Sequence, residues 1–409
     1  MKILQVNKFN YRRGGAEKYF LDISDALEKA GHEVAIFSMR HPNNHPSPWE
    51  KYFVSNLDFR KNNFFDLLRI PGRIIYSLEA RRKFTKLLDD FQPDIIHLHN
   101  IYHQISPSIL APAKKRGIPV IMHLHDYKLF CPNYKLYTQN AFCERCLGGK
   151  YGNCLKYRCL DNSFFRSLIA DFEMWVHHRV FKFYENGINL FISPSEFTKK
   201  EAIKFSWPAE RIKVLINFID KINNEEITKN ESNYLLYYGR LSPEKGIDVL
   251  LEALAKVPTG HLKIAGIGMS EEELKSYAKK TKIQDRVEFL GFKSGNELQS
   301  LVSGARAVVI PSRWPENMPF TLLESLNAGT PVIAANVGGL PEIIKEGENG
   351  FLFKSEDAGD LAEKINLLSS LPKDVSERAA RSVSEFSIDE HLKSLIGIYQ
   401  DLVNKKTPR

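Results

Sequence analysis

Two charged residues in the second half of the chain have the types and spacing to hold a phosphorylated ligand. Arg240 and Lys245 lie in YYGRLSPEKG, on a predicted loop between a strand that ends at Gly239 and a helix that starts near Ile247. At the carboxyl end of a strand, the fork of an arginine and the point charge of a lysine can bracket a diphosphate. The alternative is a solvated loop with two ordinary surface cations.

A pair of glutamates follows in PSRWPENMPFTLLESLNAGTPVI, residues 311–333. The pattern predicts Glu316 in a loop and Glu324 in a helix, with Pro319 in the first helical turn and Gly329 in the left-handed position after its end. The loop presents backbone N–H groups at a positive helix terminus, which favours an anion. This arrangement suits a nucleotide sugar, whose hydroxyl groups flank a diphosphate. The alternative is that Glu316 caps the helix and Glu324 faces solvent.

Glycines mark two further loops between predicted strands and helices. LKIAGIGMSEEEL places Gly266 and Gly268 where a base or ribose could approach the backbone closely, and VIAANVGGLPEII carries Gly338 and Gly339. One Gly-x-Gly is weak support. Several such loops in one half of the chain favour a nucleotide-binding sheet domain.

Taken in order, the segments GRLSPEKG, IAGIG, ENMPFTLLESLNAGTPVIA, VGGLPEII and ENGFLF resemble the carboxyl-terminal half of the retaining glycosyltransferases of family 4. The resemblance spans residues 237–353. It implies the GT-B fold, an α/β architecture of two Rossmann-like doubly wound domains facing a cleft, with a C-terminal helix that crosses back to the first domain.

The resemblance also implies roles for single residues. Arg240 and Lys245 would hold the donor diphosphate, Glu324 would bind the ribose, and Glu316 would contact the donor sugar. Other positions expected at the donor are Gly239, Gly266, Gly268, Asn317, Met318, Pro319 and Phe320. The Asn-Met-Pro tripeptide departs from the commoner glycine-rich loop, and Pro319 removes one N–H from the anion site.

The amino-terminal half reads as a second domain of alternating strands and helices. MKILQVN predicts a strand, and an amphipathic helix is expected from Ala16 to Ala30. Gly14 and Gly15 resemble the family's first loop, close to donor and acceptor; the alternative is a simple tight turn. Further strands are expected within 93–100 and 118–127.

Histidines occur at the carboxyl ends of the two later strands, where ligands of open parallel sheets bind. His125 and Asp126 match a His-Asp pair that the family places beside the donor's sugar and phosphate, and closure of the cleft would bring His125 towards the sugar. We expect structural roles for His97, His99 and His123. No catalytic metal is expected, because Arg240 and Lys245 already neutralise the diphosphate.

The expected domains are 1–219 for the acceptor, 220–232 as a linker, 233–385 for the donor, and 386–409 as a returning helix. The expected reaction moves a hexosyl group from a UDP- or GDP-sugar to a hydroxyl of a glycan, polysaccharide precursor or lipid-linked acceptor, with retention. The leaving phosphate would help to take the acceptor proton. The alternatives are an epimerase, a sugar phosphorylase, which lacks a recognisable pyridoxal phosphate motif here, and an inactive nucleotide-sugar-binding protein.

All five cysteines fall between Cys131 and Cys159. Four of them, in the spacing C-x2-C-x7-C-x4-C, can hold a structural zinc ion, and we predict such a site. The predicted ligands are Cys143, Cys146, Cys154 and Cys159, with Cys131 able to replace one of them. Reduced thiols, an iron-sulfur centre and redox pairing are the alternatives.

The net charge of +8 calls for an anionic partner. Much of the positive charge lies in residues 60–88, where Lys and Arg alternate with apolar residues. Such a stretch suits an anionic membrane surface, and the alternative is a helix pair packed on the first domain. No nucleic acid is expected, because no binding motif accompanies the charge. With no secretory signal and no spanning segment, the expected location is cytoplasmic, at the inner face of the membrane.

Overall fold

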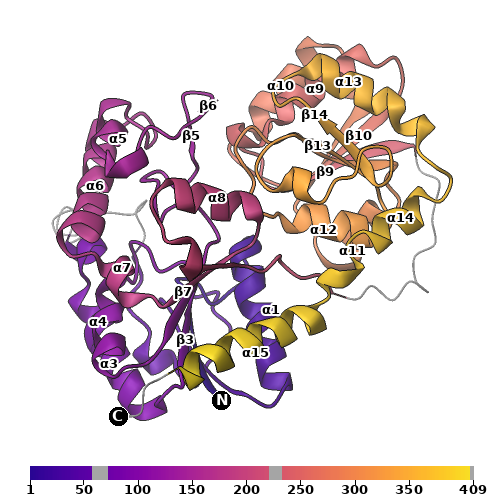
Figure 1. The fold of residues 1–409 in the computed structure, drawn as a ribbon. Helices are drawn as coiled ribbons and strands as arrows, with labels where there is room; N and C mark the ends of the chain where they lie inside the picture. Colours follow the sequence, from indigo (N-terminus) through magenta and orange to yellow (C-terminus); the bar gives the residue numbers. More distant parts are fainter. Residues whose placement is uncertain (58–71, 221–232, 406–409) are drawn as a thin grey trace. The chain divides into compact units, whose positions relative to one another are not determined.

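The computed structural model describes residues 1–57, 72–220 and 233–405. The chain divides into two compact units, each built on its own parallel sheet (Figure 1). The first unit holds residues 1–136, 144–216 and 389–409, and the second holds 137–143 and 217–388.

The first unit contains a six-stranded parallel sheet in the order β2-β1-β3-β4-β7-β8. Its central strands are short apolar runs whose residues are almost all buried, as expected of a sheet that helices cover on both faces. The strands are β1 (Lys2–Val6), β2 (Glu33–Phe37), β3 (Ile95–Leu98), β4 (Val120–His123), β7 (Leu190–Ser193) and β8 (Ile212–Val214).

Serine side chains fix the starts of three helices of the first unit, because Ser77, Ser163 and Ser195 each accept a hydrogen bond from a backbone N–H of the first turn. The helices are α1 (Gly15–Lys29), α3 (Leu78–Phe91), α4 (Leu110–Lys115), α5 (Gly152–Lys156), α6 (Phe164–Trp175), α7 (Phe183–Gly187), α8 (Glu196–Lys204) and α15 (Ile388–Asn404). A short hairpin, β5 (Tyr137–Thr138) and β6 (Ala141–Phe142), lies within the cysteine-containing stretch.

The second unit repeats the architecture, with a six-stranded parallel sheet in the order β11-β10-β9-β12-β13-β14. Figure 1 shows α9, α10 and α13 together on one face of this sheet and α11, α12 and α14 on the other. The strands are β9 (Tyr234–Tyr238), β10 (His261–Ala265), β11 (Val287–Gly291), β12 (Ala307–Ile310), β13 (Val332–Ala335) and β14 (Gly350–Phe353). The helices are α9 (Ile247–Lys256), α10 (Glu271–Lys280), α11 (Gly295–Ser303), α12 (Phe320–Asn327), α13 (Ala358–Leu367) and α14 (Val375–Arg381).

The helices predicted from the sequence closely match those of the structure. The helix expected at 16–30 runs from Gly15 to Lys29, and the helix expected to return to the first domain is α15, which groups with the first unit. One detail was wrong: Pro319 is the N-cap of α12, with extended backbone, and does not belong to its first turn.

Two predicted segments fall wholly or partly outside the described residues. The linker 220–232 is described only at residue 220, and the basic stretch 60–88 only from residue 72. The described part of that stretch includes α3, which buries Phe84, Leu87 and Leu88 in the core of the first unit. Lys83 of α3 donates to the carbonyl oxygen of Phe53 and pairs with Glu79. For these residues the structure therefore favours a packed helix over a membrane-facing one.

Candidate active site

In the second sheet, successive strands are added first on one side of β9 and then on the other. This change of side defines a candidate site. From β9 the chain adds β10 and β11 on one side, then crosses back to place β12 on the other side. In open α/β sheets the loops at the carboxyl end of such a switch point diverge and leave room for a ligand. The two loops concerned, residues 239–246 after β9 and 311–319 after β12, carry Arg240, Lys245 and Glu316, and Glu324 follows on α12.

A buried ion pair joins these two loops. The Lys245 ammonium lies 2.6 Å from the Oε1 atom of Glu316, and the Ser312 hydroxyl donates to the same oxygen over 2.6 Å. Glu316 is 4% exposed. The Lys245 Nζ atom also lies 5.1 Å from the centre of the Trp314 ring. A buried carboxylate needs such partners to remain charged, so the pair holds a cation and an anion in fixed positions at the switch point.

Glycines let the surrounding loops approach one another. A β-carbon on Gly246 would lie 2.1 Å from the carbonyl oxygen of Pro311, and one on Gly338 would lie 2.1 Å from that of Glu316. Both glycines have positive φ, 66° and 62°. The Gly339 N–H donates to the Glu316 carbonyl over 2.7 Å, so the loop after β13 fixes the backbone of Glu316.

The loops after β9 and β10 are packed in the same way. A β-carbon on Gly266 would lie 1.8 Å from the carbonyl oxygen of Gly239, and one on Gly268 would lie 2.0 Å from that of Leu241. The Leu241 N–H donates to the Ile267 carbonyl over 3.1 Å. These glycines therefore permit close packing between the loops, and the predicted approach of a base or ribose to them stays a prediction.

Arg240 and Glu324 lie at the same edge of the sheet but are less buried than the ion pair. The Arg240 side chain is 61% exposed and lies 3.3 Å from the carboxylate of Glu244. Glu324 lies on α12 next to the Tyr238 hydroxyl, whose pKa is raised well above its usual value by burial and then by the Glu324 charge. Tyr238 donates to the Thr321 carbonyl over 3.0 Å and so ties the end of β9 to the first turn of α12.

The loop that enters α12 holds the remaining predicted donor residues. Asn317 and Pro319 are half-buried, Met318 is buried, and Phe320 begins the helix. The Met318 carbonyl accepts from the Asn217 side chain over 2.8 Å, and the Phe320 ring lies edge-on to Phe218 at 6.0 Å. These contacts fix the helix N-terminus, where N–H groups and the helix dipole favour an anion.

The first unit has its own switch point, between β1 and β3. The Lys8 N–H, just after β1, donates to the Asn100 carbonyl just after β3, over 2.9 Å. Gly14 and Gly15 follow on this loop: Gly14 is the N-cap of α1 with extended backbone, and Gly15 starts the helix. The contact of these glycines with donor or acceptor stays a prediction.

The predicted His-Asp pair lies at this edge, directly after β4. His125 Nε2 lies 2.9 Å from His99 Nδ1, and His99 Nε2 lies 2.8 Å from the Gln5 Oε1 atom. Burial, and then the nearby Lys8 ammonium, lowers the pKa of His125 to about 3, so its imidazole is neutral at pH 7. Burial raises the pKa of the neighbouring Asp126, whose Oδ1 accepts from the Lys128 N–H over 2.9 Å.

The three histidines expected to be structural are buried in the first unit. His97 lies 2.7 Å from the Tyr399 hydroxyl of α15, and His391 of α15 lies 2.7 Å from the Tyr19 hydroxyl. Both nitrogens of His123 are buried without a hydrogen-bond partner among the described residues. The imidazoles thus form a neutral stack that joins β3 and β4 to the terminal helix.

The predicted zinc site is not supported. In the parts of the chain that the structure describes, no group of three or more His, Cys, Asp or Glu side chains is arranged to hold a metal ion. Cys143 belongs to the second unit, whereas Cys146, Cys154 and Cys159 belong to the first. Cys146 packs in an apolar cluster with Tyr151 and Met174. Cys131, the predicted substitute, donates to the Asn133 side chain over 2.9 Å.

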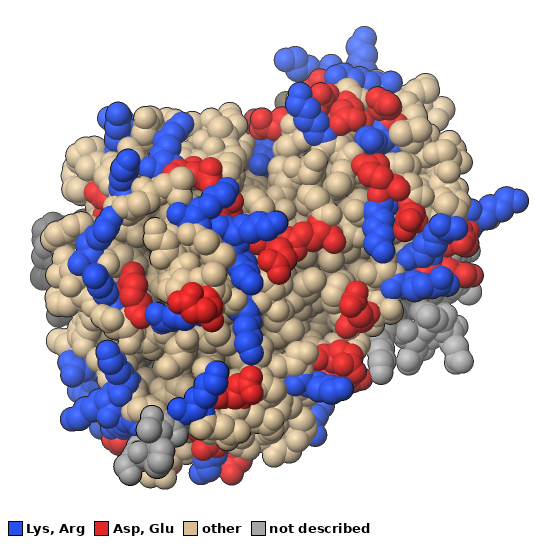
Figure 2. Space-filling view, in the orientation of Figure 1, with Lys and Arg blue, Asp and Glu red and all other residues tan. Residues whose placement is uncertain are grey.

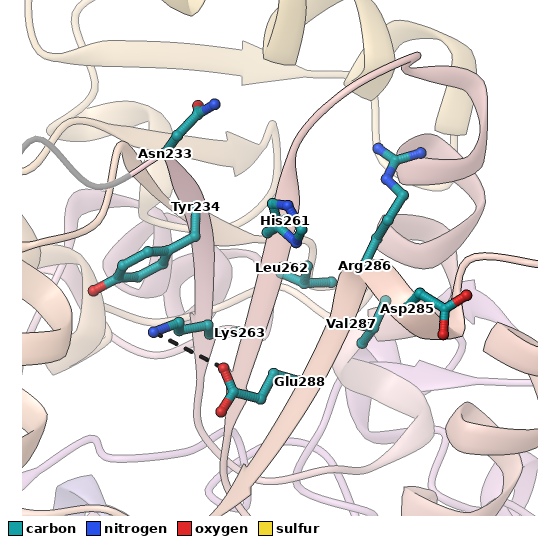
Figure 3. Close-up of a pocket in the computed structure, with 9 residues that line it drawn as sticks. All are labelled: Asn233, Tyr234, His261, Leu262, Lys263, Asp285, Arg286, Val287 and Glu288. Atoms are coloured by element: carbon teal, nitrogen blue, oxygen red, sulfur yellow. Dashed lines mark ion pairs between the residues drawn. The ribbon is translucent and has the colours of Figure 1, made fainter.

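A solvent-accessible hollow of about 510 Å³ lies elsewhere on the second unit (Figure 3). Its lining comes from the first residues of β9, β10 and β11, so it lies at the amino-terminal edge of the sheet, opposite the switch-point loops. Figure 3 shows Lys263 and Glu288 side by side, with an ion-pair distance of 3.9 Å. The Arg286 guanidinium donates hydrogen bonds to the carbonyl oxygens of Gly260 and Val257. The hollow has the wrong position for a ligand of this sheet type.

The sequence interpretation missed three residues that shape the site. Ser312 and Trp314 contact the ion pair, and Gly246 permits the loop crossing at Pro311. Gly246 could have been found, because a glycine directly before a predicted helix commonly marks a left-handed residue. Ser312 could not, because its role depends on its distance from Glu316.

Two family models match the chain. The model for Glycosyltransferase Family 4 matches residues 13–221, and the model for Glycosyl transferases group 1 matches residues 218–383.

Relatives match over part of their length. An uncharacterized glycosyltransferase (MJ1607) of Methanocaldococcus jannaschii is 31% identical over 231 residues, which cover 51% of this chain and 59% of that protein. The D-inositol 3-phosphate glycosyltransferase of Mycolicibacterium smegmatis is 33% identical over 175 residues, which cover 41% of this chain and 40% of that protein. The chain thus spans about half the length of these curated relatives.

Solved structures match over nearly the whole chain. The lipopolysaccharide outer core galactosyltransferase WaaB has a TM-score of 0.66 at 19% identity, covering 98% of this chain and 100% of that one. Anabaena Alr3699/HepE in complex with UDP has a TM-score of 0.68 at 19% identity, with the same coverage. These likenesses show the GT-B fold, and with the family models they confirm the predicted fold class. The chain belongs to glycosyltransferase family 4.

Proposed function

We propose that the chain transfers a sugar from a nucleoside diphosphate sugar to an acceptor hydroxyl. The observation that carries the proposal is the buried pair of Lys245 and Glu316, fixed by Ser312 at the switch point of the second sheet. Departure of a nucleoside diphosphate develops negative charge, which preorganised cations stabilise best where water is excluded. Lys245 would stabilise that charge, and the more exposed Arg240 would bind the same diphosphate from the solvent side.

The donor would lie across the loops after β9 and β12. Glu324 would accept hydrogen bonds from the ribose hydroxyls, and Glu316 would contact the sugar. The amide groups at the start of α12 would meet the phosphates, except at Pro319, which has none. We propose UDP as the carrier, because the structurally similar Anabaena protein is described in complexes with UDP and with UDP-glucose. GDP remains the second candidate.

The first unit would supply the acceptor side. A neutral imidazole can donate a hydrogen bond to a sugar hydroxyl or accept one from it. The pKa of about 3 keeps His125 neutral across the physiological range. Asp126, Gly14 and Gly15 would contact the substrates from the same edge. We propose a glycan precursor or lipid-linked acceptor, and hexosyl transfer with retention, in which the leaving phosphate helps to take the acceptor proton.

Product analysis tests this proposal. The purified chain would be incubated with UDP- and GDP-sugars and a panel of hydroxyl acceptors, and the products would be identified by mass spectrometry and by NMR of the anomeric centre. A glycoside of unchanged anomeric configuration is expected. An isomerised donor would instead indicate an epimerase, and nucleotide binding without turnover would indicate an inactive binding protein; either result contradicts the proposal.

A further inference from the structure

Helix α6 of the first unit is oriented with its apolar side chains towards solvent. Its inward-facing positions are small or polar, namely Ser167, Ala170 and Glu173, all buried, together with Met174. Its outward positions carry large apolar side chains. These exposed residues are Phe164, Phe165, Leu168, Ile169, Phe172 and Trp175, with exposures between 37% and 75%. We call this surface the α6 face.

A buried ion pair fixes this orientation. The carboxylate of Glu173 lies 2.9 Å from the ammonium of Lys128 and 3.1 Å from His103 Nε2. Glu173 and Lys128 are both almost fully buried. Rotating α6 to bury its aromatic side chains would expose or separate this pair, and leaving one buried charge without its partner is strongly unfavourable. The α6 face is therefore held outward by the fold.

The exposed surface continues past the helix. A π-helical turn (Val176–Val180) follows directly, and Val180 and Phe181 are 47% and 56% exposed. The rings of Phe172 and Trp175 stack with their centres 6.0 Å apart. Scattered apolar residues on a protein surface are ordinary, but a contiguous run of this kind marks a binding surface.

The charges around the α6 face have one predominant sign. Residues 145–183 contain seven Lys or Arg and three Asp or Glu. All seven basic residues are exposed. Of the three acidic residues, Glu173 is buried and paired, Asp171 is half-buried, and Asp161 is exposed and paired with Arg166. Over the part of the surface where α5 and α6 lie in Figure 1, Figure 2 shows Lys and Arg side chains, together with some Asp and Glu side chains, among uncharged atoms. The partner that fits the α6 face has an apolar interior beneath a negatively charged outer layer.

We propose that the α6 face docks on the surface of a bilayer that contains anionic phospholipids. Phe and Trp side chains favour the boundary between headgroups and acyl chains, and the surrounding basic residues would meet the lipid phosphates. At 12 residues, α6 is about 18 Å long and lies in the membrane plane without crossing it. No described helix has the length and apolar character needed to cross a membrane.

Vesicle binding tests the proposal with the full chain and without any sugar donor. The probes are vesicles of phosphatidylcholine alone and of phosphatidylcholine with an equal part of phosphatidylglycerol. The test variant combines Phe165→Ser, Phe172→Ser and Trp175→Ser. The control is Phe292→Ser, which removes an aromatic side chain of 70% exposure from the second unit. Thermal melting of each variant checks that the fold is kept.

The wild-type chain and the control are expected to cosediment with the anionic vesicles, and binding weakens in high salt. The triple variant is expected to bind about 100-fold more weakly, at roughly fivefold for each interfacial side chain. In the wild type, anionic vesicles shift tryptophan emission to the blue, and Trp175→Phe removes that shift while retaining most of the binding.

Three results would overturn the proposal. One is vesicle binding by the triple variant equal to that of the wild type. Another is no vesicle binding by the wild type, with concentration-dependent dimerisation that the triple variant loses, which would assign the α6 face to a second copy of the chain. The third is an α6 face that is already protected from hydrogen exchange without lipid, which would indicate cover by another segment of this chain.

Discussion

The two sheets of the chain carry switch points of the same topology but opposite chemistry. In the second unit the loops at the switch point hold a charged pair, Lys245 and Glu316, with Arg240 exposed beside it. In the first unit the corresponding edge holds His99 and His125, whose pKa values burial lowers. One edge therefore offers a fixed ion pair, and the other offers neutral imidazoles with the Lys8 ammonium nearby.

Under the proposed function, this difference would let one architecture serve two halves of a reaction. A diphosphate needs permanent positive charge, which lysine and arginine supply at any physiological pH. A sugar hydroxyl needs a group that can donate and accept without repelling a cation, which a neutral imidazole provides. The fold supplies the position in both units, and the side chains at the loop ends decide which part of the substrate each edge can bind.

The largest effect is predicted for removal of the negative charge at the switch point of the second sheet. Glu316→Gln keeps the shape of the side chain and an oxygen that can accept from Lys245 and Ser312, but it removes the charge. We expect the rate of sugar transfer to fall about 1,000-fold, because the sugar loses a preorganised carboxylate in the transition state. The control Glu288→Gln lies at the opposite edge of the same sheet, and comparable rates for the two variants would contradict the assignment.

A backbone change should sharpen the comparison by loosening the same edge without touching a charge. Gly338→Ala places a β-carbon 2.1 Å from the Glu316 carbonyl oxygen, at a φ of 62°. We expect a loss of about 3 kcal/mol in the free energy of unfolding. Gly347 has a φ of 73° and open space around it, so Gly347→Ala should cost about 1 kcal/mol. Denaturant titration of both variants measures the difference, and equal losses would show that the collision is unimportant.

Acid should distinguish the two units. Burial lowers the pKa of His177 and of His391 to about 4, so the unfolded chain binds more protons than the folded one between about pH 6.5 and 4. Well above pH 6.5 these histidines are neutral in both states and do not reduce stability. As the pH falls to 5, each one lowers the free energy of unfolding by about 2 kcal/mol. Asp126 and Glu17, whose pKa values burial raises, act in the opposite sense.

Hydrogen exchange resolved by peptide measures this effect. The only histidine within residues 217–388 is His261, which is exposed. On acidification from pH 7.5 to 5, exchange in β3, β4 and α15 should rise before exchange in the second sheet, after correction for the intrinsic rate. Equal responses in both units would remove the contrast between a charged edge and a neutral one.

The smallest effect is expected at Arg240. Its side chain is 61% exposed, so water screens its charge. We expect Arg240→Gln to weaken donor binding about tenfold, seen as a higher KM for the donor. A loss as large as that of Glu316→Gln would mean that Arg240 moves into a buried position when the donor binds.

Much of the fold could be predicted from apolar runs and glycines. The strand Tyr234–Tyr238 and the start of the next helix at Ile247 are found where the pattern placed them. The grouping of Lys245 with Glu316 was also accessible, through the family resemblance. Their direct contact through Ser312 was not, because it depends on two loops that are far apart in sequence.

The cysteine stretch shows the opposite case. The spacing of its thiols resembles a zinc site, but spacing alone does not determine where each side chain points, and Cys146 packs against apolar neighbours. The outward face of α6 was missed for a related reason. An apolar stripe in sequence normally predicts burial, and here the buried pair of Glu173 and Lys128 decides the orientation.

Calorimetric titration with UDP tests the central claim most directly, namely that the switch point of the second sheet binds the donor diphosphate. The variants are Lys245→Met at the carboxyl edge of the sheet and Lys263→Met in the hollow at the amino edge (Figure 3). We predict that UDP binds the wild type and Lys263→Met equally, and Lys245→Met at least about 30-fold more weakly. Undiminished binding to Lys245→Met, or loss of binding in Lys263→Met alone, would contradict the account.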